Sequence, residues 1–213
     1  MGIFNYDSGI MRALNKFTDC MLLSVLFLVS CIPVFTIGTA ATALYYTVYK
    51  VLRKDRGYIF RDYLASFRDN FKQTVPIWLL VLLIGMVLGA DWNIMRQYTK
   101  DETIMSILTV VFFVGMTVLL AWSSYLFPYM ARFENTRKQS MKNAILLVVA
   151  HLPMTVLLLA LILIAVFLFY MAPLLIVFLP AVHALTASFI LERIFRKYMT
   201  EEERTREEEL DRV

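Results

Sequence analysis

The chain is poor in the residues from which most catalytic and metal sites are built. Only seven glycines, two cysteines and two histidines occur among 213 residues. The sequence has no glycine-rich phosphate loop and no His-Glu-x-x-His, Gly-x-Ser-x-Gly or Cys-x-x-Cys pattern. Cys20 and Cys31 lie in one apolar segment, about 16 Å apart on a helix, which is too far for a disulfide. We therefore expect a protein that is not an enzyme and that has no cofactor and no bound metal.

Charged side chains are missing from long stretches. Residues 143–191 contain no Lys, Arg, Asp or Glu over 49 positions. A helix of that length measures roughly 73 Å, more than two hydrocarbon layers of about 30 Å, so this stretch is expected to cross twice. Composition agrees, because 60% of residues are hydrophobic and 18% charged, where soluble domains have about 45–50% and about 25%. These features exclude a soluble domain and indicate a polytopic membrane protein.

The expected fold is all-α: a polytopic transmembrane helical bundle of five or six membrane segments with one amphipathic cytoplasmic helix. A single domain over residues 1–198 holds segments at about 20–32, 38–50, 74–95, 103–131, 143–169 and 173–192. The amphipathic helix is expected at residues 58–72. Residues 199–213 are expected to form a charged, solvated cytoplasmic tail.

The first apolar stretch allows two interpretations. Residues 20–49 are long enough for one steeply tilted helix, or for two short ones broken at Pro33, Thr36 and Gly38. Two crossings give six segments and a cytoplasmic N-terminus, which the basic residues Arg12 and Lys16 favour. One crossing gives five segments and an external N-terminus. We prefer six, although the two members of the pair need not both span fully.

The distribution of basic residues predicts the orientation. Residues 50–72 hold seven Lys or Arg, residues 132–142 hold four, and the connections on the other side hold few. Basic loops remain in the cytoplasm, so both loops and the C-terminus are expected there. The net charge of +4 is explained by this orientation signal and by attraction to the inner leaflet, and it does not indicate nucleic-acid binding. The lipid bilayer is the expected partner.

The cytoplasmic segment 58–72 has a strongly patterned face. At 100° per residue, its aromatic side chains fall within roughly a 100° arc: Phe60, Tyr63, Phe67 and Phe71. This pattern is typical of an amphipathic helix at the membrane interface. The stripe is expected to be buried against the protein's own helices, against lipid, or against a docking partner.

Few ionisable residues lie within the expected membrane depth. They are Asp91 at the outer end of its segment, His151 next to a Leu-Pro pair, and His183 near the middle of the last segment. Such groups are functional candidates because their burial is costly. Either histidine can form a hydrogen bond between helices or line a polar pathway.

Three stretches of the sequence resemble a known family. Residues 1–9, the break region 32–46 and residues 60–73 are similar to the YesL-type bacterial membrane proteins, grouped as domain of unknown function 624. The resemblance extends over essentially the whole chain and supplies no catalytic residues. Members tend to be encoded beside carbohydrate-uptake ABC systems of Gram-positive bacteria, which implies a place in the bacterial plasma membrane and a role in sugar acquisition.

Two functional hypotheses follow. The first is a non-enzymatic accessory or sensing subunit of a carbohydrate ABC uptake system, docked on its permease or ATPase subunits. The second is a small self-contained transporter of a sugar or related solute that works as a homo-oligomer, with Asp91, His151 and His183 along its path.

Overall fold

The computed structural model describes residues 9–98 and 102–201 together with residues 204, 205, 207 and 209. Regular structure in this part is helical throughout. The α-helices are α1 (Gly9–Ser30), α2 (Ile37–Thr47), α3 (Ile59–Tyr98), α4 (Glu102–Arg132), α5 (Arg137–Ala150), α6 (Leu152–Met171) and α7 (Leu179–Phe195). Three short elements join them: the 3-10 helices η1 (Val34–Thr36) and η3 (Pro173–Val177) and the π-helix η2 (Val48–Arg53).

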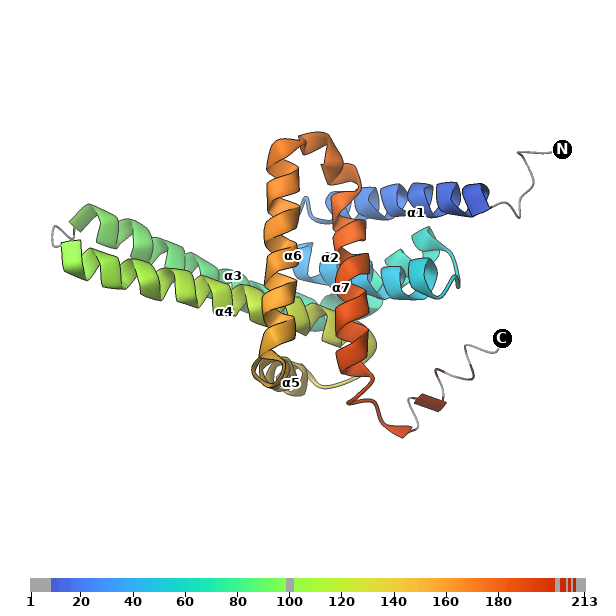
Figure 1. The fold of residues 1–213 in the computed structure, drawn as a ribbon. Coiled ribbons are helices and arrows are strands. Elements are labelled where there is room, and N and C mark those ends of the chain that lie inside the picture. The colour runs from blue at the N-terminus through green and yellow to red at the C-terminus, as the bar shows by residue number, and fades with distance from the viewer. Residues whose placement is uncertain (1–8, 99–101, 202–203, 206, 208, 210–213) are drawn as a thin grey trace.

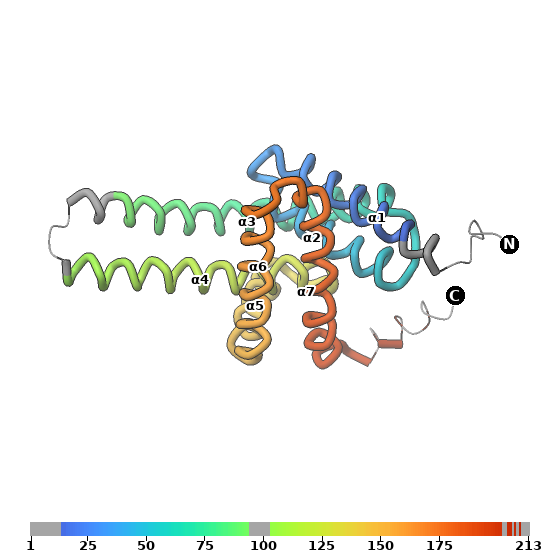
Figure 2. Tube along the Cα trace, turned by 45° about the horizontal axis from the view of Figure 1, so that its top comes forward, coloured from blue at the N-terminus to red at the C-terminus, as the bar shows by residue number. Residues whose placement is uncertain are grey.

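Helices α3 and α4 form a long antiparallel hairpin that projects beyond the rest of the molecule (Figure 1). Helices α1 and α2 run along the base of this hairpin, whereas α6 and α7 cross it in both views (Figure 2). Three stretches of the described chain are long and apolar enough to cross a membrane: Ile59–Asn93, Thr103–Arg132 and Leu152–Met171. The predicted all-α fold is confirmed, because every regular element of the described chain is a helix. The predicted count of five or six membrane segments is not confirmed, and the three candidate spans do not form a parallel bundle.

The first apolar stretch is broken. Helix α1 ends at Ser30, and Pro33 has extended backbone angles before η1 begins. The Thr36 hydroxyl lies 2.5 Å from the carbonyl oxygens of both Ser30 and Pro33 and supplies a donor where the helical pattern stops. Gly38, expected within the break, already lies in the first turn of α2. The chain therefore folds back as two helices, α1 and α2, that run side by side (Figure 1).

The amphipathic helix expected at residues 58–72 and the segment expected at 74–95 form one continuous helix, α3. The helix continues through residues 72–74, and Pro76 lies inside it without ending it. A proline leaves the carbonyl four residues earlier, here that of Lys72, without its helical donor. The Arg137 guanidinium donates to this carbonyl at 2.7 Å and so replaces the missing backbone N–H.

Two helices share the segment expected at residues 143–169. Helix α5 ends at Ala150, and His151 leaves the helical backbone region before α6 begins. Pro153 lies in the first turn of α6, where a backbone N–H has no helical partner to lose. The expected turn near Pro173 is present as η3, so α7 starts later than the segment expected at 173–192.

The core lies where the base of the hairpin meets α2 and α7. Its buried aromatic residues are Tyr45, Tyr125, Tyr129, Phe133 and Phe195. Helix α2 approaches the hairpin closely at Gly38, where a Cβ atom would lie 2.6 Å from Cβ of Trp78 and 2.7 Å from the Phe127 ring. This close approach brings α2 between the hairpin and α7, and thereby positions the polar groups described next.

Candidate functional site

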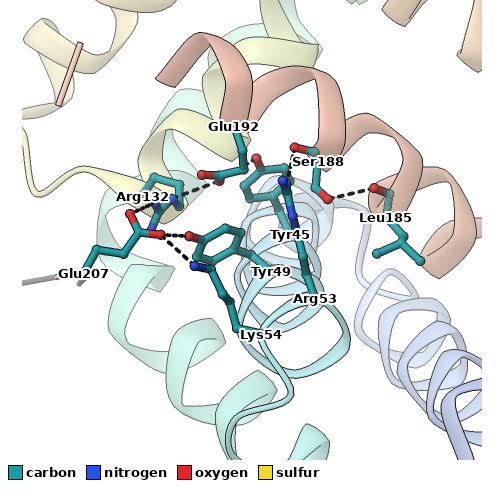
Figure 3. A network of polar contacts seen from close by, with 9 residues as sticks. All are labelled: Tyr45, Tyr49, Arg53, Lys54, Arg132, Leu185, Ser188, Glu192 and Glu207. Carbon is teal, nitrogen blue, oxygen red and sulfur yellow. Dashed lines mark hydrogen bonds and ion pairs between the residues drawn. The ribbon is translucent and has the colours of Figure 1, made fainter. Parts of the chain in front are cut away.

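A network of polar side chains crosses this core (Figure 3). Glu192 in α7 is 1% exposed, and its Oε1 accepts a hydrogen bond from the Tyr45 hydroxyl at 3.0 Å. The same oxygen lies 2.9 Å from Nε of Arg132, the last residue of α4. Within the described part of the chain, Oε2 of Glu192 is buried without a hydrogen-bond partner. One buried carboxylate therefore joins α2, α4 and α7.

Arg132 links this carboxylate to a second one. Its guanidinium carbon lies 4.0 Å from the centroid of the Tyr49 ring, a cation–π contact. Its Nη2 lies 3.1 Å from Oε2 of Glu207. As a cation at the C-terminus of α4, Arg132 also interacts favourably with the helix dipole. Arg53 joins the network from η2 by donating to the Ser188 carbonyl at 2.8 Å.

The tail, expected to be solvated, folds back onto the helices at Glu207. This side chain is 16% exposed, accepts a hydrogen bond from the Tyr49 hydroxyl, and lies 3.4 Å from Nζ of Lys54. Burial alone raises the pKa of Glu207, but the Tyr49 hydrogen bond and the charges of Arg132 and Lys54 outweigh it. They hold the pKa below its usual 4.5. Glu207 is therefore ionised at neutral pH.

An apolar cavity of about 480 Å³ lies beside the network, between α1, α2, α4, α6 and α7. Tyr45 lines it and so stands between the cavity and Glu192. The hydroxyls of Ser123 and Ser124 also lie in the wall but donate to carbonyls of their own helix at 2.8 Å. The volume falls within the range of about 300–1,000 Å³ typical of ligand sites, and the lining suits an apolar group.

The structure does not bring the three predicted polar residues together. His183 lines the cavity from α7. His151 lies at the break between α5 and α6, with its ring centroid 5.8 Å from that of Tyr198. Asp91 is exposed on the projecting part of α3. No group of three or more His, Cys, Asp or Glu side chains that could hold a metal ion occurs among the described residues.

The aromatic stripe of α3 is divided between interior and surface. Tyr63 is fully buried against α1 and α2, whereas Phe60 is 59% exposed. Phe67 and Phe71 are half-buried, and their rings continue the row from Tyr63 at centroid distances of 6.3 Å and 5.9 Å. Contact of Phe60 with lipid or with a partner therefore stays a prediction.

Sequence reasoning did not identify Glu192, Arg132 and Glu207 as a cluster. Arg132 entered the prediction only as one of the four basic residues at 132–142, and Glu192 did not enter it. A usable signal was present, because Glu192 continues the helix of that block and is preceded by 49 uncharged residues. A carboxylate in such a position requires a cation from another helix.

The all-helical fold and three apolar helices of spanning length indicate a membrane protein. Residues 20–92 match the family model described as "Protein of unknown function, DUF624". The match contains residues 32–46 and 60–73, so the predicted resemblance to this family is confirmed there; the narrower YesL-type likeness stays a prediction. No curated protein and no solved structure matches the chain.

Proposed function

We propose that the chain is a non-enzymatic accessory subunit that docks on a permease subunit of a bacterial carbohydrate ABC uptake system. The observation that carries this proposal is the continuity of α3. Its 40 residues extend about 60 Å, twice the hydrocarbon thickness of about 30 Å. One continuous helix thus connects an apolar stretch with the interfacial part that bears Phe60.

The proposed orientation places the protein in the plasma membrane with the C-terminus and the η2–α3 connection in the cytoplasm. The distribution of basic residues supports this orientation. The fold supports it too, since α1 begins on the same side as the η2–α3 connection, opposite the far ends of α3 and α4 (Figures 1 and 2). In this orientation α1 enters the membrane from the cytoplasm and α2 returns to the cytoplasmic side, as the six-segment interpretation requires.

The docking surface is the exposed apolar strip at the start of α3. Phe60 and Leu64 are 59% and 44% exposed and lie one turn apart on the same face. The buried Tyr63 fixes this turn to the protein's own core. Burying an aromatic side chain contributes about 1.5–3 kcal/mol, so a groove on a permease that accepts Phe60 gains a substantial part of its affinity there.

The test is co-purification from native membranes in mild detergent, after growth on the inducing oligosaccharide. The wild-type chain is expected to recover permease subunits, and Phe60→Asp is expected to lose them while accumulating normally. Arg61→Ala is the matched control, because Arg61 is the exposed neighbour on α3 and its loss removes no apolar contact. Recovery of the wild-type chain alone under induction would refute the proposal, and recovery of an ATPase subunit alone would assign a different docking partner.

The orientation has its own test. Cysteines placed at Arg56 or Arg204, in a chain without Cys20 and Cys31, are expected to resist membrane-impermeant thiol reagents in intact cells. Both become reactive after permeabilisation. Labelling of either position from outside contradicts the orientation.

The cavity favours a second candidate function, an oligomeric transporter. It is large enough for a small ligand, and His183 lines it. Its mainly apolar wall is unsuited to a sugar, which needs many hydrogen-bond partners. Solute uptake by proteoliposomes that contain only this chain supports the transporter, and its loss in His183→Ala would place the path through the cavity.

A further inference from the structure

The apolar cavity of about 480 Å³ follows the facing sides of α6 and α7. On α7 its lining runs from Leu179 to Leu191, and on α6 it runs from Leu158 to Phe169. At 1.5 Å per residue these stretches measure about 18 Å and about 17 Å. The two helices are antiparallel neighbours (Figure 1), so the cavity is elongated along both of them and suits an extended chain.

The cavity reaches the outer surface of α6. Val166 and Phe169 line it, and their side chains are 60% and 42% exposed. Both residues belong to the candidate membrane span Leu152–Met171. The exposed face of a spanning helix contacts lipid, so a hydrocarbon chain can enter the cavity from the bilayer without crossing water.

One polar side chain of the wall is free to bind a ligand. The hydroxyls of Ser123 and Ser124 donate to carbonyls of α4, and the Tyr45 hydroxyl donates to Glu192. The remaining polar side chain of the lining is His183, and its imidazole has no hydrogen-bond partner within the described part of the chain. A neutral imidazole carries one N–H donor. The cavity therefore offers a single donor to a ligand that is otherwise apolar.

The lining discriminates among the possible occupants. A buried water needs two to four polar partners, and a sugar needs more. A free fatty acid carries a full negative charge, and among the described residues no Lys or Arg lines the cavity to compensate it. An acyl ester combines an apolar chain with an uncharged carbonyl acceptor, which matches the single donor.

We propose that the cavity binds one acyl chain of a membrane glycerolipid and that His183 donates a hydrogen bond to the ester carbonyl of this chain. From His183 to Leu191 the lining extends about 12 Å along α7, which accommodates the part of the chain next to the ester. Lipid binding in this cavity requires no permease subunit, so its test is independent of the docking at Phe60.

The first experiment locates the chain. The full-length protein is placed in phosphatidylcholine nanodiscs with a trace of diester phosphatidylcholine that carries a diazirine in mid-chain, and the cross-linked residues are mapped by mass spectrometry. Wild type is expected to be labelled mainly at the cavity-lining residues of α6 and α7. Ala165→Phe places a ring in the cavity, and this overpacking should lower the cavity labelling about fivefold or more.

Leu163→Phe is the matched control, because Leu163 lies on α6, is 70% exposed and does not line the cavity. It should be labelled as wild type is. Labelling of wild type that is spread evenly over the exposed face of α6 overturns the proposal. A monodisperse Ala165→Phe protein labelled as strongly in the cavity as wild type overturns it too.

The second experiment tests the contact between His183 and the ester. The same trace probe is added to nanodiscs of diester or of diether phosphatidylcholine, whose ether-linked chains have no carbonyl. A hydrogen bond lost by the competing bulk lipid should raise the cavity labelling of wild type about two- to tenfold in the diether nanodiscs. His183→Leu should remove this difference. His151→Leu is the matched control, since His151 lies outside the cavity, and it should retain the difference.

Equal labelling of wild type in the two kinds of nanodisc overturns the contact with the ester. A difference that persists in His183→Leu overturns the role of His183. If an added free fatty acid displaces the probe more strongly than the same amount of diester lipid, the occupant is a fatty acid and the assignment of a glycerolipid is wrong.

Discussion

Replacement of Gly38 by alanine tests the packing that positions the polar network. Gly38 lies in the first turn of α2, against α3 and α4. An added Cβ would meet Cβ of Trp78 at 2.6 Å and the Phe127 ring at 2.7 Å. Neither contact is to the free end of a flexible chain, and the two rings already pack edge to face at 5.8 Å. Helix α2 must therefore move away from the hairpin.

The expected cost is that of overpacking a filled core, about 1–3 kcal/mol. Alanine has a helix propensity about 1 kcal/mol better than glycine, which offsets part of this cost. For a chain of this length, 1 kcal/mol corresponds to about 2–4 °C in Tm, so Gly38→Ala should lower the Tm by several degrees. The displaced α2 should also weaken the hydrogen bond from Tyr45 to Glu192.

The assay is thermal unfolding of the purified chain in detergent, with Gly89→Ala as matched control. Gly89 lies in α3, and a Cβ there meets no atom within 4 Å, so its replacement should leave the Tm unchanged or raise it. A Gly38→Ala protein as stable as Gly89→Ala would refute the close approach of α2 to the hairpin.

Three further predictions concern the charged groups. Arg137→Gln should lower the stability by about 0.5–1.5 kcal/mol, because the Lys72 carbonyl freed by Pro76 loses its donor. Lys138→Gln, in the same turn of α5, is the control, and equal Tm values for the two variants would contradict the role of Arg137 as that donor. Glu192→Gln should cost about 3 kcal/mol, because Arg132 loses its buried partner, and a Tm equal to that of wild type would contradict the buried pair. The pKa of Glu207 is lowered on folding, so the ionised side chain stabilises the fold above pH about 4.5, and this stabilisation is lost as the pH falls through the folded pKa. The Tm of the wild type should therefore drop more steeply on acidification than the Tm of Glu207→Gln. Parallel pH profiles would contradict the contact of Glu207 with the helices.

The helical fold and the break after α1 follow from local sequence. Long uncharged runs predict apolar helices, and Pro33 predicts the end of α1 because a proline cannot continue the hydrogen-bond pattern. The positions of other boundaries could not be predicted from local sequence. Pro76 does not interrupt α3, since a residue 61 positions later, Arg137, satisfies the freed carbonyl.

The charged cluster was beyond prediction for a related reason. Tyr49, Arg132 and Glu207 are separated by 75 residues or more along the chain. Each one alone has an ordinary explanation: an aromatic residue at a membrane interface, a basic loop residue, and an acid in a solvated tail. Only the tertiary arrangement, with α4 ending beside η2, brings them together.

Pro76 divides α3 into an interfacial arm, which begins at Ile59, and a longer apolar arm, which ends at Tyr98. Pro76 lies 17 residues from Ile59, the start of α3, so the interfacial arm is about 26 Å long. A bend of about 10° introduced at Pro76 would move the tip of this arm by about 4–5 Å. The Arg137 contact lies one turn from this fulcrum, on Lys72. Because Tyr63 on the same arm is buried against α1 and α2, a displacement of α5 reaches Phe60 only if these two helices move together with the arm.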